Sequence, residues 1–263
     1  MNNTLLDRAR NGEKLTDIDI LDLHGHFGRY MHGVPDLTAD GLVRVMDRLG
    51  VRAIVVSHMQ CTSMHVRRGN DEVLQAMQNF PGRILGYVTL FPSSEEAATA
   101  EMKRCVENGF TGLKLHTSNG FPYTDPGYAG ALTIANERCM PVLLHTWGSE
   151  KDEDALRELA PRHPDAAFLM AHSGAGDGGN RCISLAREFD NVYLDLAYST
   201  GPRGMVEKLV AEAGAEKVLY GSDCYFFSMT QQIGKVIGAR ISDADKRKIL
   251  HENAQRLLNR IAS

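Results

Sequence analysis

Eight short apolar runs, separated by polar stretches with helical periodicity, most constrain the fold of this chain. Each run has the length, the β-branched residues and the turn-forming neighbours of a strand. The runs are "IDILDLH", "RAIVVSH", "ILGYVTLF", "TGLKLH", "MPVLLH", "AFLMAH", "VYLDL" and "KVLYGSD". They end at positions 24, 58, 91, 116, 145, 172, 196 and 223, so successive ends are 24 to 34 residues apart.

The stretches between the runs are typical of amphipathic helices. Residues 37–50 repeat apolar side chains every three or four positions, and Gly50 follows where a helix would end. Residues 95–110 have the same design. The last predicted helix opens with Ser242 and has Asp245 three residues later, which is a capping-box pattern.

Strand and helix therefore alternate eight times, and this alternation predicts parallel strands joined by crossover helices. Eight such units in about 250 residues favour a single-domain α/β fold, the (β/α)8 TIM barrel. An open sheet of six strands with a cap is the alternative, and it requires two of the runs not to be strands. No linker or low-complexity segment divides residues 1–263, so we expect one domain with its core at about 18–260.

Composition excludes several classes of protein. The net charge of −4 gives no electrostatic basis for binding nucleic acid. Five cysteines without a C-x-x-C pair are typical of a reduced, intracellular protein. The polar N-terminus lacks the apolar core of a signal peptide, and no apolar run is long enough to cross a membrane. We expect a cytoplasmic protein with no membrane partner.

Histidine and aspartate stand at the ends of six of the eight runs, although the chain has only ten histidines. The chemistry of such barrels lies at the carboxyl ends of the strands. Several imidazoles and a carboxylate gathered at this edge can hold a catalytic divalent metal. These residues are His24, His58, His116, His145, His172 and Asp223, with His26 two positions after His24.

The motifs "DLHGH", "GLKLH", "PVLLHTWG", "FLMAHSG", "LYGSD" and "ILHENAQRLL", in this order, resemble the amidohydrolase superfamily. The match is to the amidohydrolase-related branch, which includes aminocarboxymuconate-semialdehyde decarboxylase and its relatives. The resemblance extends from about residue 18 to 260. It implies a metal-dependent TIM-barrel enzyme, but it specifies no substrate.

The resemblance also implies a role for each matched residue. His24, His26 and His145 match the histidine ligands of a single divalent metal. Asp223 matches the aspartate that contacts both the metal and its water, and His172 matches a histidine beside that water. Zinc is the expected metal, and Mn²⁺, Fe²⁺ or Co²⁺ would also suit these ligands.

Lys114 lies two residues before His116 and on the same predicted strand face. In two-metal members of the superfamily, a carboxylated lysine on the fourth strand bridges the metals, and Lys114 is a possible bridging ligand of this kind. The alternative is a buried lysine paired with a carboxylate, since an unpaired buried charge is costly. Asp22, which shares the predicted face of His24, is a candidate partner.

Three other residues are candidate substrate contacts. Arg29 closely follows the paired histidines and could hold a substrate carboxylate through two hydrogen bonds. His116 stands at a strand end, and Trp147 follows His145 by two positions. A surface ion pair for Arg29 and purely structural roles for His116 and Trp147 are the alternatives.

These observations favour a metal-dependent hydrolase that cleaves an amide, lactone or ester bond of a small, carboxylate-bearing substrate. Zinc lowers the pKa of a bound water to about 7, and Asp223 could accept its proton while the metal-bound hydroxide attacks. The alternative is non-oxidative decarboxylation of an aromatic or unsaturated acid at the same residues. A barrel that binds a metal or metabolite without turnover is a third hypothesis. We also expect a homo-oligomer, most simply a dimer.

Overall fold

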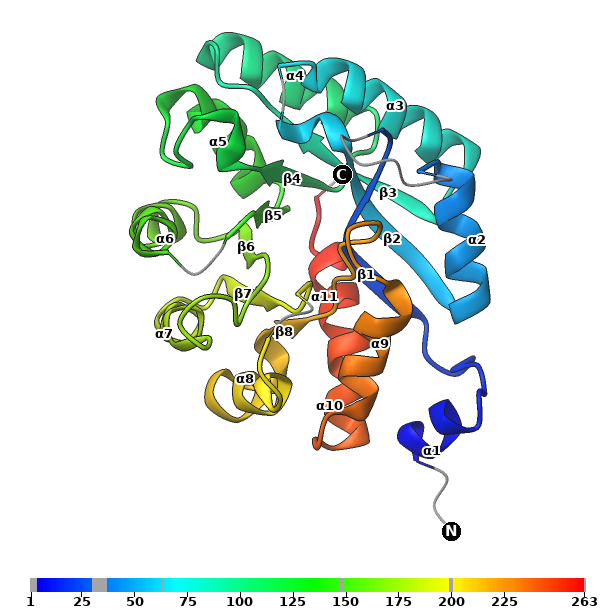
Figure 1. The fold of residues 1–263 in the computed structure, drawn as a ribbon. Helices are drawn as coiled ribbons and strands as arrows, with labels where there is room; N and C mark the ends of the chain where they lie inside the picture. The colour runs from blue at the N-terminus through cyan, green and yellow to red at the C-terminus, as the bar shows by residue number, and fades with distance from the viewer. Residues whose placement is uncertain (1–3, 30–36, 63, 147–148, 199–200, 263) are drawn as a thin grey trace.

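Eight parallel strands form the centre of the computed structural model, which describes residues 4–29, 37–62, 64–146, 149–198 and 201–262. Figure 1 shows the strands at the centre of a ring of helices. The strands pair in the order of the sequence, from β1 to β8. They are β1 Ile20–Phe27, β2 Val51–His58, β3 Ile84–Thr89, β4 Gly112–Leu115, β5 Pro141–Leu144, β6 Ala167–Met170, β7 Val192–Asp195 and β8 Val218–Leu219. This is the predicted (β/α)8 TIM barrel, and the open-sheet alternative is excluded.

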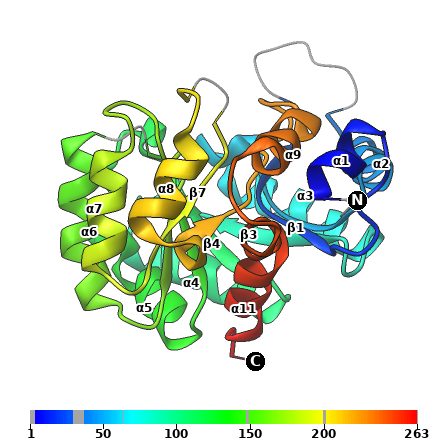
Figure 2. The same cartoon turned by 90° about the horizontal axis from the view of Figure 1, so that it is seen from below.

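The helices surround the strands, as the turned view in Figure 2 also shows. The α-helices are α1 Leu5–Arg10, α2 Ala39–Leu49, α3 Val66–Asn79, α4 Glu95–Glu107, α5 Ala129–Glu137, α6 Glu150–Arg162, α7 Asn180–Glu188, α8 Met205–Ala213, α9 Met229–Gly238, α10 Asp243–Arg247 and α11 Asn253–Asn259. Gly50 ends α2 in the left-handed conformation, as predicted. None of the helices within the described ranges combines the length and apolar character that crossing a bilayer requires.

Backbone hydrogen bonds between β1 and the segment after β8 close the barrel. The amide of Leu23 donates to Tyr220 O over 3.1 Å, and the amide of Asp223 donates to His24 O over 2.6 Å. The amide of His26 donates to Cys224 O over 2.6 Å. The first and last strands therefore bring residues about 200 positions apart in the sequence to one edge of the molecule.

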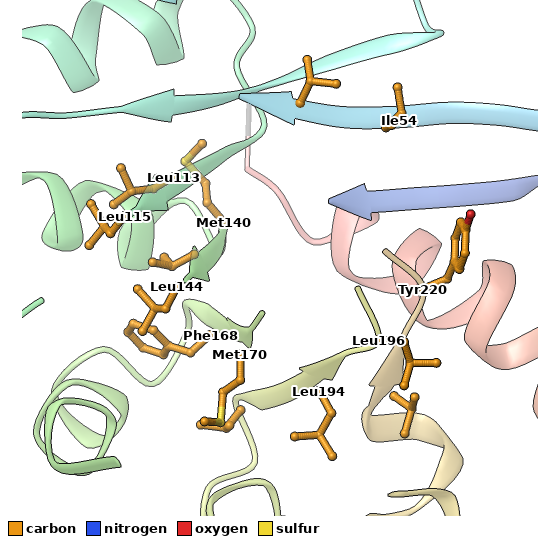
Figure 3. Packing of buried hydrophobic residues seen from close by; sticks show 14 of the residues in the cluster. Ile54, Leu113, Leu115, Met140, Leu144, Phe168, Met170, Leu194, Leu196 and Tyr220 are labelled. Atoms are coloured by element: carbon orange, nitrogen blue, oxygen red, sulfur yellow. The ribbon is translucent and has the colours of Figure 1, made fainter. Parts of the chain in front are cut away.

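The core has two apolar layers. One lies between the strands and the helices, and Figure 3 shows part of it, including Ile54, Leu113, Phe168 and Leu194. The other, smaller cluster includes Leu23, Val55, Tyr87, Leu143 and Leu169. Because alternate residues of a strand face opposite sides, every run except the fourth supplies apolar side chains to both layers, and the fourth has Lys114 on the inner side. This arrangement explains why the runs are almost continuously apolar.

Several strands end earlier than the apolar runs predict. β6 ends at Met170, two residues before His172, and β8 ends at Leu219, four residues before Asp223. His172 and Asp223 have φ angles of 59° and 50°, in the left-handed region that side chains other than glycine seldom adopt. Such strain costs about 1–3 kcal/mol per residue and concentrates at functional sites.

The C-terminal region also differs from the prediction. Ser242 caps α10 and accepts a hydrogen bond from the Asp245 amide, as expected. The predicted single helix is instead interrupted by a π-helical turn over Lys248–Glu252 before α11 begins. A further helix, α9, lies between β8 and α10 and packs against α1.

Candidate metal centre

A bulge in β1 determines which of its side chains face the barrel interior. Asp22 pairs with Ile54, but Gly25 pairs with Val56, so β1 holds one extra residue between these positions. Ile54 and Val56 both belong to the layer between strands and helices. Asp22 therefore faces that layer, whereas His26 pairs with Ser57 on the opposite face. The prediction that Asp22 shares the face of His24 and His26 is wrong, because it assumed strict alternation.

Asp22 instead holds the bulge in place. Its Oδ1 atom accepts hydrogen bonds from the backbone amides of His24 and Ser222, each over 3.0 Å. The His24 amide belongs to the irregular part of β1, where the regular pairing is interrupted. Burial raises the pKa of Asp22 to about 7, and these hydrogen bonds oppose that effect.

Three imidazoles surround the carboxylate of Asp223. Its Oδ1 atom lies 3.2 Å from His26 Nε2 and 3.6 Å from His24 Nε2. Its Oδ2 atom lies 3.9 Å from His172 Nε2. One ligand atom each of His24, His172 and Asp223 lies within 4.8 Å of the other two, a spacing that could hold a metal ion. All four side chains are buried.

The other ring nitrogen of each imidazole, Nδ1, lies beside an oxygen atom that can accept a hydrogen bond. His24 Nδ1 lies 2.8 Å from Asp195 Oδ2, and His172 Nδ1 donates to Ala197 O. His26 Nδ1 lies 3.3 Å from Ser57 O and 3.0 Å from the Ser57 hydroxyl. In His24 and His172, these contacts favour a proton on Nδ1 and leave the Nε2 lone pair available on the side of Asp223.

This arrangement fits a divalent cation. Lone pairs on three nitrogens and a carboxylate would repel one another, and a cation between them removes that repulsion. Among the described residues, the buried Asp223 Oδ1 atom has no hydrogen-bond partner, although two imidazole nitrogens lie within 3.6 Å of it. His24, His172 and Asp223 form the compact set of possible ligands, and His26 Nε2 lies beside it, 3.2 Å from Asp223 Oδ1.

Burial keeps the imidazoles of His24 and His172 neutral. It lowers the pKa of His24 well below its usual value, and the charge of Lys114 acts in the same direction. Burial also lowers the pKa of His172 to about 4, despite the opposing charge of Asp223. The pKa of Asp195 is raised by burial to about 8, whereas Lys114 pulls it down. A cation in the site would act on Asp195 as Lys114 does and favour its ionised form.

Lys114 lies on β4 and is almost completely buried. Its Nζ atom is 3.3 Å from His24 Nε2, and its charge acts on Asp195. The ammonium group therefore lies beside the proposed ligands and compensates a buried carboxylate. These contacts support the interpretation of a buried, compensated lysine, and the possible bridging role remains a prediction.

His145 and His116 form a second pair beside the cluster. Their rings stack at 3.8 Å between centroids and 21° between planes. His145 Nδ1 lies 3.3 Å from His172 Nε2, so His145 contacts the cluster through His172. His116 Nδ1 accepts a hydrogen bond from the Ser118 amide and also caps a short 3-10 helix. The predicted roles of His145 as a ligand and of His116 as a substrate contact remain predictions.

The predicted substrate contacts not yet described are Arg29 and Trp147. Arg29 is exposed just after β1, and Trp147 lies outside the described residues. His58 pairs with Glu72 over 3.0 Å and packs edge-on against Phe27. Phe226, which is 44% exposed, lies edge-on to His26 with 5.7 Å between ring centroids. Phe226 therefore places an aromatic surface beside the cluster.

Sequence reasoning missed Asp195 and Ser57, which hold His24 and His26 in place. Both lie inside apolar runs, whereas only residues at the ends of the runs were selected in the sequence analysis. The available signal was a buried acid in "VYLDL" and a hydroxyl directly before His58 in "RAIVVSH". A carboxylate that fixes a ligating histidine is a common feature of metal sites.

Gly221 allows Asp195 to approach His24, and we expect Gly221→Ala to disrupt this contact. A Cβ atom at residue 221 would lie 1.9 Å from Asp195 Oδ1 and 2.7 Å from His24 Cβ. We expect metal affinity to fall about 10- to 100-fold and the unfolding free energy to fall by about 1–3 kcal/mol. Competition with a chromophoric chelator and thermal unfolding measure these effects. Gly234→Ala on α9, where a Cβ meets open space, is the matched control. Equal affinities in both variants would contradict the assignment.

Comparisons with known proteins agree with this fold and identify a family. A sequence model described as amidohydrolase matches residues 21–260. Gamma-resorcylate decarboxylase of Polaromonas sp. JS666 is 24% identical over 290 residues, covering 84% of this chain and 88% of the relative. The crystal structure of 2,6-dihydroxybenzoate decarboxylase from Rhizobium superposes with a TM-score of 0.72 at 18% identity, covering 92% of this chain and 99% of that one. A dihydroxybenzoic acid decarboxylase from Polaromonas sp. JS666, with bound manganese and the inhibitor 2-nitroresorcinol, gives a TM-score of 0.72 at 19% identity, covering 92% and 97%.

Proposed function

Because the chain belongs to the amidohydrolase family, we propose that it is a metal-dependent enzyme that decarboxylates a small aromatic hydroxy acid. The observation that carries the proposal is the group of three imidazole Nε2 atoms around the Asp223 carboxylate. The similarity to several decarboxylases supports the lyase reaction, which was the alternative to hydrolysis in the sequence analysis. The aromatic surface of Phe226 beside His26 suits a planar ring.

His24, His26 and Asp223 would hold one divalent cation, and His145 remains the proposed fourth ligand. When bound, the cation would hold the acidic oxygens of the substrate and stabilise their negative charge. Zinc was the metal expected from the sequence, whereas a similar structure contains manganese. We therefore propose Mn²⁺ or Zn²⁺.

Decarboxylation requires one proton at the ring carbon that carries the carboxylate. The proton forms a C–H bond there, the C–C bond breaks, its electron pair restores the aromatic ring, and CO2 leaves. His172 is a poor donor at neutral pH, because its Nδ1 proton is bound to Ala197 O and burial lowers its pKa to about 4. Asp223 is therefore the proposed proton donor. The donated proton stays in the product, so Asp223 must take a new proton from solvent before the next turnover. His172 Nε2, 3.9 Å from Asp223 Oδ2, would accept that solvent proton and pass it to Asp223.

Incubation of the protein with 2,6-dihydroxybenzoate and related hydroxybenzoates is expected to release CO2 and the corresponding phenol in equal amounts. The protein should be purified without chelators, and elemental mass spectrometry should find about one metal per chain, as expected for a single-metal site. A lactone, ester and amide panel serves as the comparison. Hydrolysis of that panel without CO2 release from any aromatic acid would contradict the proposal and favour the hydrolase. Two metals per chain would instead support a bridging role for Lys114.

A further inference from the structure

Lys235, on the outer side of the barrel, donates hydrogen bonds to the segment that follows β7. Its Nζ atom donates to Leu196 O and, over 2.6 Å, to Tyr198 O. A third hydrogen bond goes to Gln232 Oε1 over 2.5 Å. An ammonium group has three N–H donors, so these acceptors satisfy it completely. Burial lowers the pKa of Lys235 to about 8, which still leaves the ammonium form predominant at neutral pH.

The carbonyl between these two acceptors is directed toward the proposed active site. Ala197 O accepts the hydrogen bond from His172 Nδ1. The carbonyls of Leu196 and Tyr198 accept hydrogen bonds from Lys235 on one side of the segment, whereas the carbonyl of Ala197 between them accepts from His172 on the other. The Tyr198 amide also donates to Leu196 O over 2.6 Å, and this hydrogen bond closes a tight turn over residues 196–198. Ala197 itself is fully buried.

We infer that Lys235 is a positioning residue that sets the tautomer of His172 through the 196–198 segment. The inference rests on the proposed role of His172. With Ala197 O fixed, the Nδ1 proton of His172 is held, and Nε2, which lies 3.3 Å from His145 Nδ1 and 3.9 Å from Asp223 Oδ2, is left to accept a proton. Without Lys235, the carbonyls of Leu196 and Tyr198 lose their hydrogen-bond donor, so the direction of Ala197 O between them is no longer fixed. The Nε2–H tautomer of His172 then becomes accessible. In that tautomer, Nε2 already carries a hydrogen and cannot accept a proton.

Lys217, on the 3-10 helix Ala215–Lys217 before β8, provides a matched control at the other end of β7. Its Nζ atom donates to Phe189 O, Asp190 O and Val192 O, over 3.0, 2.7 and 3.4 Å, at the opposite end of β7. Both lysines are partly buried and both hold backbone carbonyls. Only Lys235 does so at the end of the barrel that carries His172. Lys235 also borders a hollow of about 590 Å³ between α8 and α9, so a methionine has space in its place.

The test compares Lys235→Met, Lys235→Arg and Lys217→Met in the metal-reconstituted full chain. We expect Lys235→Met to lower kcat for CO2 release about 10- to 100-fold, with metal content and KM close to those of the parent. Lys235→Arg should recover most of the loss, because its guanidinium can still donate to two carbonyls. Lys217→Met should be destabilised while keeping its kcat.

Long-range ¹H–¹⁵N NMR of histidine-labelled protein tests the inference independently of turnover. The His172 signal, assigned by its loss in His172→Gln, should show the Nδ1–H tautomer in the parent and a mixture in Lys235→Met. An unchanged tautomer, or an equal change in Lys217→Met, would overturn the inference. If no aromatic acid is decarboxylated, the proposed function fails, but the tautomer measurement still decides the role of Lys235.

Discussion

Replacing Asp223 by asparagine is expected to lower kcat/KM for CO2 release by about 10³-fold, because the amide can neither carry the proton nor supply the negative charge. The change leaves the shape of the side chain almost unaltered. Asparagine also tolerates the left-handed conformation of residue 223, where φ is 50°. The variant should therefore fold, and the loss should reflect chemistry rather than structure.

Metal binding should weaken in the same variant. Asp223 is the carboxylate whose oxygen lies within 3.6 Å of both His24 Nε2 and His26 Nε2. Elemental mass spectrometry and a chelator competition would quantify the change alongside the rate of CO2 release. Asp243→Asn, which alters a carboxylate that caps the Leu5 amide far from the cluster, is the control. Activity in Asp223→Asn comparable to that of this control would exclude Asp223 as the proton donor.

The barrel could be predicted because its determinants are local and repeated. Strand-length apolar runs alternate with amphipathic stretches eight times, and few folds have this order. The irregular parts of the fold could not be predicted from such local patterns. β8 has only two residues in the strand conformation, and its run continues into a segment that bonds with β1 instead. Likewise, the π-helical turn at Lys248–Glu252 depends on packing against β1 and β8 rather than on its own periodicity.

From the sequence, the candidate site could be predicted only through the residues at the ends of the strands. His24, His26, His172 and Asp223 do converge, because the carboxyl ends of parallel strands meet at one edge. The orientation of each ring depends on partners from other strands, such as Asp195, and these contacts are set by register. A bulge of one residue reverses the faces of a strand, and in "DILDLHGH" it is marked by Gly25, a residue type that indicates a bulge without fixing its position.

Replacing His172 by alanine is expected to abolish most turnover while leaving about one metal bound per chain. His172 Nε2 faces Asp223 Oδ2 at 3.9 Å, whereas Oδ1, on the other side of the carboxylate, faces His24 and His26. The loss of a positioned proton acceptor lowers a rate by about 10²- to 10⁴-fold.

Metal content separates this role of His172 from that of a ligand. His172 also lies within 4.8 Å of His24 and Asp223, so the geometry of the cluster permits direct coordination. Elemental mass spectrometry of His172→Ala, beside His163→Ala as a control near the amino-terminal end of β6, distinguishes the two roles. Retained metal with lost turnover assigns His172 to proton handling. Loss of the metal in His172→Ala alone would make His172 a ligand, and a solvent proton would then have to reach Asp223 by another route.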